Sequence, residues 1–561
     1  MTKARITDYD GAGAHTSAWP APDKIILMKT HRWRFVLANI VVCCDGTWNS
    51  ADNRDDGRPA PTNVRKFFAE VAKPAGPDNQ NLEQFSYYGS GVGTSGGVFK
   101  RVLGGAIGFG LEDDIKSAYK FLAETYRSDD DRIFLLGFSR GAYTARSLAG
   151  MIGRLGLLDM TDKDLTEKEK WDATHAALIR YQSEKTDGDL GMMQRHFWLR
   201  QPQGDFSGLS VRHADIHFLG VWDTVGSLGV PDDLGLLKGL IGDPRKHRFH
   251  DTKLGAIVQN ARHAVAIDER RLDFTPTLWT EANKDRVKQV WFPGVHGDVG
   301  GSYSDHDLGD ITLRWMMIEA ETLGLVFRSD PKKLLKNNPQ GQLHNSVSGV
   351  FRFRRTRPRS VPSFVQKTDQ MSRLSPQAVA RNKRPASGEV EYWPCRHLSL
   401  NASVTVQVRA QDRWNRTGIF VKKGEEYRLA ATGEWLDASI VASPDGANPG
   451  FHPGKAAYFA AAAPEAYRAL LRKFKKTRNA DNSFSRRVQD APWFALIGAI
   501  SNGKGIDSGT QVLDTHQYFK IGTQAALTPD DDGFLYAFAN DAWAAYGNNA
   551  GRISLTVERV S

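Results

Sequence analysis

The chain has 561 residues, of which 40% are hydrophobic and 25% are charged, and its formal net charge is +10. This length exceeds one compact core, so we expect two or three domains, and the composition is that of an ordinary soluble globular protein. The positive charge suits contact with anionic surfaces such as phospholipid headgroups, although a solvated basic surface explains it equally well. The sequence has no zinc-finger spacing, no RNA-recognition aromatic motif and no extended basic tail, so we expect no nucleic-acid partner.

The cysteines and the N-terminus bear on the cellular compartment. Cys43 and Cys44 are adjacent, a geometry that rarely forms a disulfide, and Cys395 is remote. We therefore expect synthesis in a reducing cytoplasm. The N-terminus lacks the charged-then-apolar order of a signal peptide, and the apolar run 35–44 is too short to span a bilayer. If the protein acts outside its cell, a signal-independent machine must carry it.

In chain order, a polar and irregular arm is expected over residues 1–34, followed by a domain over 35–360. Apolar runs in that domain alternate with helical patterns. Continuous apolar runs bounded by turn residues and separated by helices indicate a parallel sheet that is buried on both faces. The predicted fold class is therefore α/β with a mostly parallel sheet. Strands are expected over 35–42, 132–136, 216–222 and 287–292, and a helix over 111–126.

The second predicted strand leads into the most informative motif, GFSRG at residues 137–141, and a helical pattern follows the motif. G-x-S-x-G between a strand and a helix is the signature of a nucleophile elbow, in which a tight turn exposes the serine hydroxyl. The flanking glycines leave room where side chains would clash. This context predicts that Ser139 is the nucleophile of an acyl-transfer enzyme.

A serine hydroxyl needs a histidine to take its proton and an acid to orient that histidine. Asp223 directly follows the predicted strand 216–222, and His296 follows the strand 287–292 in a glycine-rich loop. Active sites of open parallel sheets are built from such strand-end loops, and the order Ser, Asp, His is that of α/β-hydrolases. Two N–H groups must also bind the oxyanion. We expect these from Arg140, the residue after the nucleophile, and from Gly46 or Thr47 in the loop after the first strand, which Asp45 could brace.

Each of these assignments has a structural alternative. Ser139 could be a small residue in a strand–helix turn, Asp223 a helix N-cap and His296 a loop-bracing histidine. Asp298 competes with Asp223 as the acid, but it lacks a strand of its own, and His306 is the reserve base. The remaining candidates, His213, His217 and His263, are expected within or beside core elements.

The sequence changes character after residue 360. A linker or extension is expected over 361–395, and short alternating strands over 396–561 indicate a β-sandwich with a helical insertion near 455–490. Within that insertion, residues 465–476 form a basic amphipathic pattern that suits either a membrane surface or its own domain. Together with the glycine-rich segment 104–110, it is a candidate lipid contact.

Near the C-terminus, the segment NDAWAAYGNNAG (540–551) clusters the oxygen-bearing side chains of Asp541, Asn548 and Asn549. Such oxygens suit a hard cation such as Ca²⁺, and an Asn/Gly-rich turn between two strands is the equal alternative. No cofactor is expected for the ester chemistry itself.

Four segments together resemble an α/β-hydrolase family whose best-understood members are antibacterial phospholipase effectors of the type VI secretion system. They are VCCDGTWN (42–49), GFSRGA (137–142), GVWDTVG (220–226) and FPGVHGDVGG (292–301), and the resemblance covers roughly residues 36–360. It implies a triad of Ser139, Asp223 and His296 that hydrolyses phospholipid esters. It also implies a secretion spike or adaptor as partner, delivery into the periplasm of a rival cell, and a cognate immunity protein.

The C-terminal domain is similar to the PA-IL-type galactose-binding lectins. The resemblance lies in residues 540–551, with support from 418–425, 433–435 and 497–500. It implies that Asp541, Asn548 and Asn549 ligate calcium and that a glycan is a candidate partner. Where those lectins have a sugar-contacting threonine, this chain has Ala545, which offers only its backbone carbonyl.

The leading hypothesis is therefore a serine phospholipase of the A type with a C-terminal lectin-like sandwich. A glycan-binding adaptor with a vestigial hydrolase domain and an esterase for small soluble esters are the alternatives. The ordered set of strand-end residues argues against the vestigial alternative.

Overall fold

The computed structural model describes residues 37–46, 53–72, 82–90, 111–162, 164–183, 209–225, 254–280, 285–353, 355–365, 372–447, 486–506 and 513–561. The N-terminal arm, the glycine-rich segment 104–110, the basic segment 465–476 and Thr47 lie outside these residues. In the described part of the chain, no helix is both long enough and apolar enough to cross a bilayer.

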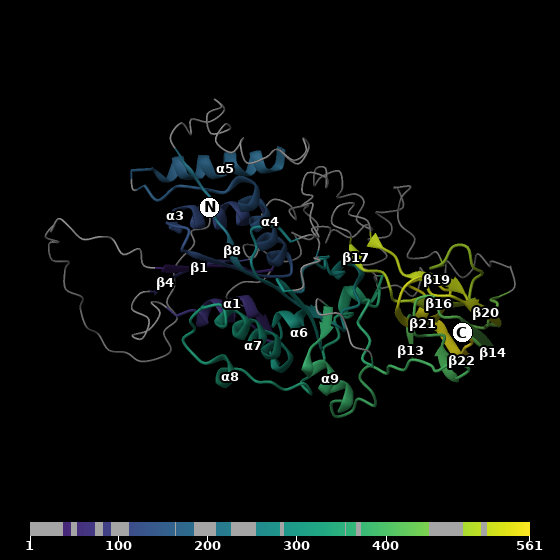
Figure 1. Ribbon diagram of the computed structural model, residues 1–561. Helices are drawn as coiled ribbons and strands as arrows, with labels where there is room; N and C mark the ends of the chain where they lie inside the picture. The colour runs from purple at the N-terminus through teal and green to yellow at the C-terminus, as the bar shows by residue number, and fades with distance from the viewer. Residues whose placement is uncertain are drawn as a thin grey trace.

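A seven-stranded parallel sheet forms the centre of the first domain (Figure 1). Its spatial order is β11-β10-β9-β8-β5-β1-β4. The chain moves outward from β1 to β4, returns to the other side of β1 with β5, and then proceeds strand by strand to β11. The strands are β1 (Leu37–Cys44), β4 (Leu82–Gly89), β5 (Arg132–Phe138), β8 (Ile216–Trp222), β9 (Ala261–Ala266), β10 (Val287–Phe292) and β11 (Ser372–Leu374).

Helices cover both faces of this sheet (Figure 1). Helices α3 (Leu111–Thr125), α4 (Arg140–Leu155) and α5 (Glu167–Ser183) lie on one face, and α1 (Asn63–Glu70) and α7 (Asp307–Glu321) lie on the other. Side-chain hydroxyl groups cap the N-termini of two helices. The Thr62 hydroxyl caps α1 by accepting from the Arg65 N–H, and Ser375 caps α9 (Pro376–Lys383) in the same way. The remaining short elements are β2 (Arg54–Asp55), β3 (Arg58–Pro59), β6 (Leu157–Leu158), β7 (Val211–Arg212), α6 (His296–Gly300), α8 (Pro331–Leu334), η6 (Leu272–Phe274) and η7 (Gly349–Phe353).

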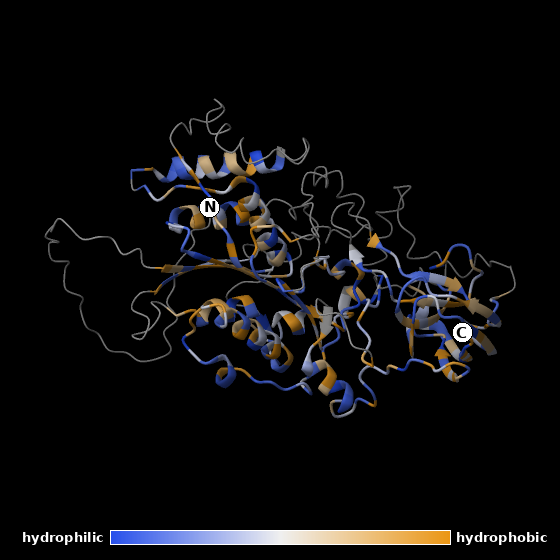
Figure 2. Cartoon of the chain, in the orientation of Figure 1, coloured by the Kyte–Doolittle hydropathy of each residue, from blue (hydrophilic) through white to orange (hydrophobic). Residues whose placement is uncertain are grey.

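Side chains of the central strand β1 alternate between two hydrophobic cores. Ile40 and Val42 pack with residues of α3, α4 and α5, whereas Val41 and Cys43 pack with residues of α1 and α7. All four side chains are fully buried, and burial of a large apolar side chain contributes about 1.5–3 kcal/mol. Figure 2 shows the hydrophobic residues along this strand and its neighbour β4. A strand that is apolar on both faces is thus explained by a core on each side.

The C-terminal domain consists mainly of two antiparallel sheets. One contains β12 (Ser403–Arg409), β22 (Asn549–Arg559), β14 (Tyr427–Asp437), β15 (Ile440–Ala442) and β20 (Gln524–Leu527). The other has the order β13 (Asn415–Val421), β21 (Gly533–Ala539), β16 (Leu496–Ile500) and β19 (Gln517–Lys520). The short pieces are β17 (Gly505–Ile506), β18 (Leu513–Asp514) and η8 (Tyr546–Asn548). The expected class, α/β with a parallel sheet plus a C-terminal antiparallel β domain, is confirmed.

The two domains share a hydrophobic core. Along β21, Leu535 and Ala537 point into the interior of the β-sandwich, whereas Phe534, Tyr536 and Phe538 join a cluster that includes Val265, Ile267 and Trp291 of the first domain. Every residue of β21 is buried for this reason. The sandwich is therefore packed against strand β9, which leads to Glu269, and against strand β10, which leads to the loop of His296.

The segment expected as a linker or extension, 361–395, contacts the first domain. Its strand β11 pairs in parallel with β10 at the edge of the large sheet, and its helix α9 follows directly. The Trp393 indole N–H and the Tyr392 hydroxyl both donate to the Asp268 carboxylate, at 3.1 and 2.6 Å. The described residues of this segment are thus packed against the first domain.

Candidate active site

Ser139 occupies a strained elbow between β5 and α4. Its backbone has φ 58° and ψ −121°, a conformation that residues with a side chain rarely adopt, and its N–H donates to the Trp222 carbonyl at 3.1 Å. The flanking glycines are sterically required. A Cβ on Gly137 would lie 2.4 Å from the Gly141 carbonyl oxygen, and a Cβ on Gly141 would lie 2.1 Å from the carbonyl oxygen of Cys44. The turn is therefore as tight as the motif predicts.

Asp223 and His296 meet at the carboxyl ends of their strands. The His296 Nδ1–H donates to Asp223 Oδ2 at 2.6 Å, so the lone pair of the base resides on Nε2. The Asp223 side chain is completely buried, and its backbone also takes a positive φ of 40°. Burial lowers the pKa of His296 despite the Asp223 carboxylate, which raises it. The imidazole is accordingly neutral near pH 7 and able to accept a proton.

The imidazole of His296 lies between two aromatic rings. The ring centroid of Phe138, the residue before Ser139, lies 4.6 Å from that of His296, and the Phe274 ring meets it edge-on at 4.8 Å. These contacts place the base beside the elbow. Within the described residues, the Ser139 hydroxyl makes no hydrogen bond, as is common in free enzymes whose catalytic bonds tighten only on substrate binding.

The loop after β1 is braced by Asp45, as expected. Its carboxylate accepts the Thr62 hydroxyl at 2.5 Å, the Tyr88 hydroxyl at 2.7 Å and the Gly46 N–H at 2.7 Å. The Gly46 N–H therefore already has an acceptor, and Thr47 lies outside the described residues. On the other side, Arg140 is the first residue of α4, where the N–H groups of a helix lack intrahelical partners. The oxyanion-hole assignment of Gly46, Thr47 and Arg140 stays a prediction.

The competing candidates have other partners. Asp298 accepts from His344 Nδ1 at 2.6 Å and from the Val295 N–H at 2.9 Å, so it caps the turn that carries His296. His306 lies before α7 and pairs with Asp310 at 3.0 Å. His263 lies on β9, where burial lowers its pKa to about 3.

His217 lies on β8 and pairs with Gln259 at 2.9 Å. His213 lies between β7 and β8, with a side chain 58% exposed. None of these histidines hydrogen-bonds to Asp223 in the described residues.

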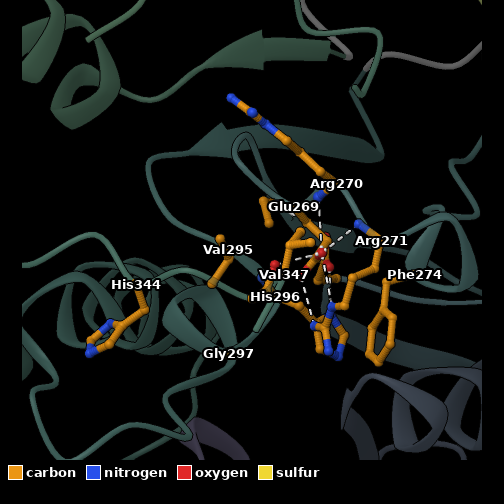
Figure 3. Close-up of polar contacts among 12 residues, drawn as sticks. Glu269, Arg270, Arg271, Phe274, Val295, His296, Gly297, His344 and Val347 are labelled. Atoms are coloured by element: carbon orange, nitrogen blue, oxygen red, sulfur yellow. Dashed lines mark hydrogen bonds and ion pairs between the residues drawn. The ribbon is translucent and has the colours of Figure 1, made fainter. Parts of the chain in front are cut away.

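Glu269 and Arg359 also hold the Asp223–His296 pair, and the sequence analysis missed both. Glu269 is buried, accepts the His296 N–H at 3.2 Å and pairs with Arg271 at 2.7 Å (Figure 3). Burial would raise the pKa of Glu269, but Arg271 and further hydrogen bonds hold it at about 2. Arg359 forms a two-point ion pair with Asp223. In the sequence, Arg359 ends an arginine-rich stretch, RFRRTRPR (352–359), and no motif marked either Arg359 or Glu269.

Residues 38–319 match a family described as T6SS, phospholipase effector Tle1-like, catalytic domain. The chain belongs to this family. It is also 30% identical, over 262 residues, to the uncharacterized protein YEL023C of Saccharomyces cerevisiae. That match covers 43% of this chain and 33% of the yeast protein, so the chain spans about a third of its relative.

Solved structures similar to this Tle1-like chain share 19% identity with it. An uncharacterized protein from Pseudomonas aeruginosa matches with a TM-score of 0.29, covering 52% of this chain and 47% of that one. The Tle1 effector bound to the VgrG spike of the type 6 secretion system matches with a TM-score of 0.27, covering 52% and 56%. The C-terminal part resembles the EclA N-terminal domain, a PllA-like lectin, with a TM-score of 0.17 over 28% of this chain and 94% of that one.

In the lectin-like domain of this Tle1-like protein, two of the three oxygen-bearing side chains that the sequence singled out, those of Asp541 and Asn549, are in contact. The amide nitrogen of Asn549 donates to Asp541 Oδ2 at 3.0 Å, and the amide nitrogen of Asn548 donates to Asp437 at 2.9 Å. Among the residues that the structure describes, the buried amide oxygens of Asn548 and Asn549 have no hydrogen-bond partner. A buried carbonyl oxygen without a donor is costly, and a hard cation is one group that satisfies it. These residues therefore fit a Ca²⁺ ion chemically.

Proposed function

We propose that the chain is a serine carboxylic-ester hydrolase that cleaves the acyl esters of membrane phospholipids. The observation that carries the proposal is the 2.6 Å bond between His296 Nδ1 and Asp223, formed beside the strained elbow of Ser139. A neutral imidazole beside the serine of an elbow, hydrogen-bonded to a buried carboxylate, is the arrangement that activates a hydroxyl nucleophile.

The proposed mechanism has two half-reactions, acylation of Ser139 and hydrolysis of the acyl-enzyme. Ser139 Oγ attacks the acyl carbonyl while its proton passes to His296 Nε2, and Asp223 stabilises the imidazolium that forms. The oxyanion is bound by the N–H of Arg140 at the start of α4 and by an N–H of the loop at Gly46 or Thr47. His296 then protonates the leaving alcohol, and water hydrolyses the acyl-enzyme with the same base.

Membership of the Tle1-like phospholipase effector family supports phospholipid as the substrate and type VI secretion as the route. A Tle1 effector has been solved with a VgrG spike, which supports a spike or adaptor protein as a partner of this chain. We further propose the periplasm of a rival bacterium as the place of action and a cognate immunity protein in the producing cell.

The test compares wild type with Ser139→Ala on phospholipid vesicles, with released fatty acid as the readout. Position-labelled phospholipid then identifies which acyl bond is cut. We expect Ser139→Ala to lose hydrolysis by a factor of about 10⁴ or more. Equal release by both proteins refutes the assignment. Cleavage of short soluble esters without gain at an interface would favour a small-ester esterase instead.

For the C-terminal domain we propose a structural Ca²⁺ held by Asp541, Asn548 and Asn549. The partnerless amide oxygens of Asn548 and Asn549 support this site. Calorimetric titration with CaCl₂ and thermal unfolding with and without chelator test it, and Asn549→Leu should abolish the heat of binding. A glycan array run in Ca²⁺ examines the sugar partner. Calcium-dependent glycan binding with no ester hydrolysis would favour the adaptor alternative.

A further inference from the structure

Arg359 binds both oxygens of the Asp223 carboxylate and shares Oδ2 with His296. Its Nη1 donates to Asp223 Oδ1 at 2.6 Å, and its Nη2 donates to Oδ2 at 2.9 Å. The same two nitrogens also donate to the carbonyl oxygens of Ala266, at 2.7 Å, and Phe274, at 2.6 Å. The guanidinium is therefore fixed by four hydrogen bonds, and its planar fork fixes the plane of the carboxylate.

The carboxylate of Asp223 is saturated by this arrangement. Oδ1 accepts from Arg359 and from the Ala266 N–H at 2.9 Å, and Oδ2 accepts from Arg359 and from His296. Asp223 is fully buried, and Arg359 is only 6% exposed. A carboxylate in such a place needs a cation, because burial disfavours its charge. While His296 is neutral, Arg359 supplies that cation.

The other charged and titratable groups around the pair are already matched. The Nδ1–H of His263 donates to the side-chain oxygen of Gln289 at 3.2 Å, and its Nε2 accepts the Thr224 N–H at 3.1 Å. Burial lowers the pKa of His263 to about 3. Beside His296, Glu269 and Arg271 neutralise each other at 2.7 Å. Arg146 of α4 lies over the Trp279 ring, near His263.

The segment that carries Arg359, residues 355–361, is held by the C-terminal sandwich, and we call it the strap. Trp414 Nε1 donates to the Thr356 hydroxyl at 3.1 Å, and His516 Nε2 contacts the Pro358 carbonyl at 2.8 Å. The His516 Nδ1 accepts the Gly503 N–H at 3.1 Å, and the His516 ring also contacts Arg357 of the strap, whose Nε lies 3.2 Å from Nε2. Two side chains of the sandwich thus contact the strap at Thr356 and at Pro358, the residue before Arg359.

We propose that Arg359 is a positioning residue for the catalytic pair: its fork aims the Asp223 carboxylate at His296 Nδ1 and keeps it ionised, and the C-terminal sandwich holds the strap that presents it. This inference rests on the proposed serine-hydrolase function. It assigns the sandwich a part in catalysis that is separate from any ligand of its own.

The proposal has a distinctive pH signature. The working form needs Asp223 ionised and His296 neutral, and the Arg359 charge lowers the pKa of the carboxyl group. Removing the Arg359 charge raises the pKa of Asp223. It also raises the pKa of His296, because the negative charge of Asp223 is then no longer balanced by Arg359. Both changes move the acid limb of the kcat/KM profile to higher pH. A residue that only stabilised the fold would leave the limb where it is.

The experiment measures pH profiles of ester hydrolysis for wild type, Arg359→Gln, Arg359→Lys and the exposed neighbour Arg352→Gln as the matched control for lost charge. For Arg359→Gln we expect kcat to fall about 10²-fold, KM to stay unchanged, and the acid limb to rise by about one pH unit. Arg359→Lys keeps the charge but loses the fork, so the limb stays and kcat falls about tenfold. Arg352→Gln should behave as wild type.

Folded Arg359→Gln protein with the kcat and acid limb of wild type overturns the proposal. If Arg359→Gln fails to fold, Arg359→Lys and His516→Gln decide, because both should lower kcat at unchanged KM. Wild-type kcat in both of these folded variants overturns it equally. Failure of the proposed function is separately visible, because wild type itself would then hydrolyse no ester or would match Ser139→Ala.

Discussion

The tight packing of the elbow makes Gly141→Ala a sharp perturbation. The new Cβ would lie 2.1 Å from the Cys44 carbonyl oxygen, about 1.3 Å short of the 3.4 Å at which ordinary contact begins. Backbone cannot swing aside as a flexible side chain does, so α4 and the end of β1 must separate. Overpacking of this kind costs about 1–3 kcal/mol. A shift of about 1 Å between the nucleophile and the oxyanion loop costs on the order of 10²-fold in rate.

Gly255→Ala is the matched control. A Cβ there meets nothing within 4 Å, and Gly255 lies outside the left-handed backbone region. It should leave activity unchanged and stability equal or higher by up to about 1 kcal/mol. Urea unfolding and vesicle hydrolysis are measured for both variants. If Gly141→Ala matches Gly255→Ala in both assays, the steric account of the elbow is wrong.

Three further predictions follow from burial and charge. Burial lowers the pKa of His296, and the neutral imidazole is the working form. The acid limb of the kcat/KM profile should therefore have a midpoint below the ordinary histidine pKa of about 6.5, and a midpoint above that value contradicts the prediction. Burial opposes protonation of His344, but the Asp298 carboxylate raises its pKa overall. A raised folded-state pKa gives stability that is present below the unfolded pKa and lost as pH rises, so His344→Gln should destabilise more at pH 5 than at pH 9 in urea titrations. Because the domains share a core, calorimetry should show a single unfolding transition. Trp414→Ala should move this whole transition to lower temperature and reduce the free energy of unfolding by about 3–5 kcal/mol. Two separate transitions would contradict the shared core.

Most of the strands that the sequence predicted are rich in apolar residues, as β5 and β8 are. Strand β9 was not predicted from the sequence, because its six residues include Arg262 and His263. Both are nevertheless buried, since Arg262 pairs with Glu319 at 2.6 Å and His263 joins the Gln289 network. Polar residues can occupy a core strand when distant partners satisfy them, and those partners are visible only in three dimensions.

The sequence by itself determined the elbow at Ser139 and the strand-end positions of Asp223 and His296. These features depend on steric demands between near neighbours and on the rule that parallel strands end at one edge of a sheet. Only the tertiary structure decided which carboxylate serves His296, since Asp298 is taken by His344. It also brought Arg359, 136 residues beyond Asp223, against that carboxylate. The physical reason is that a buried charge selects its partner by proximity in the folded chain, which no local pattern encodes.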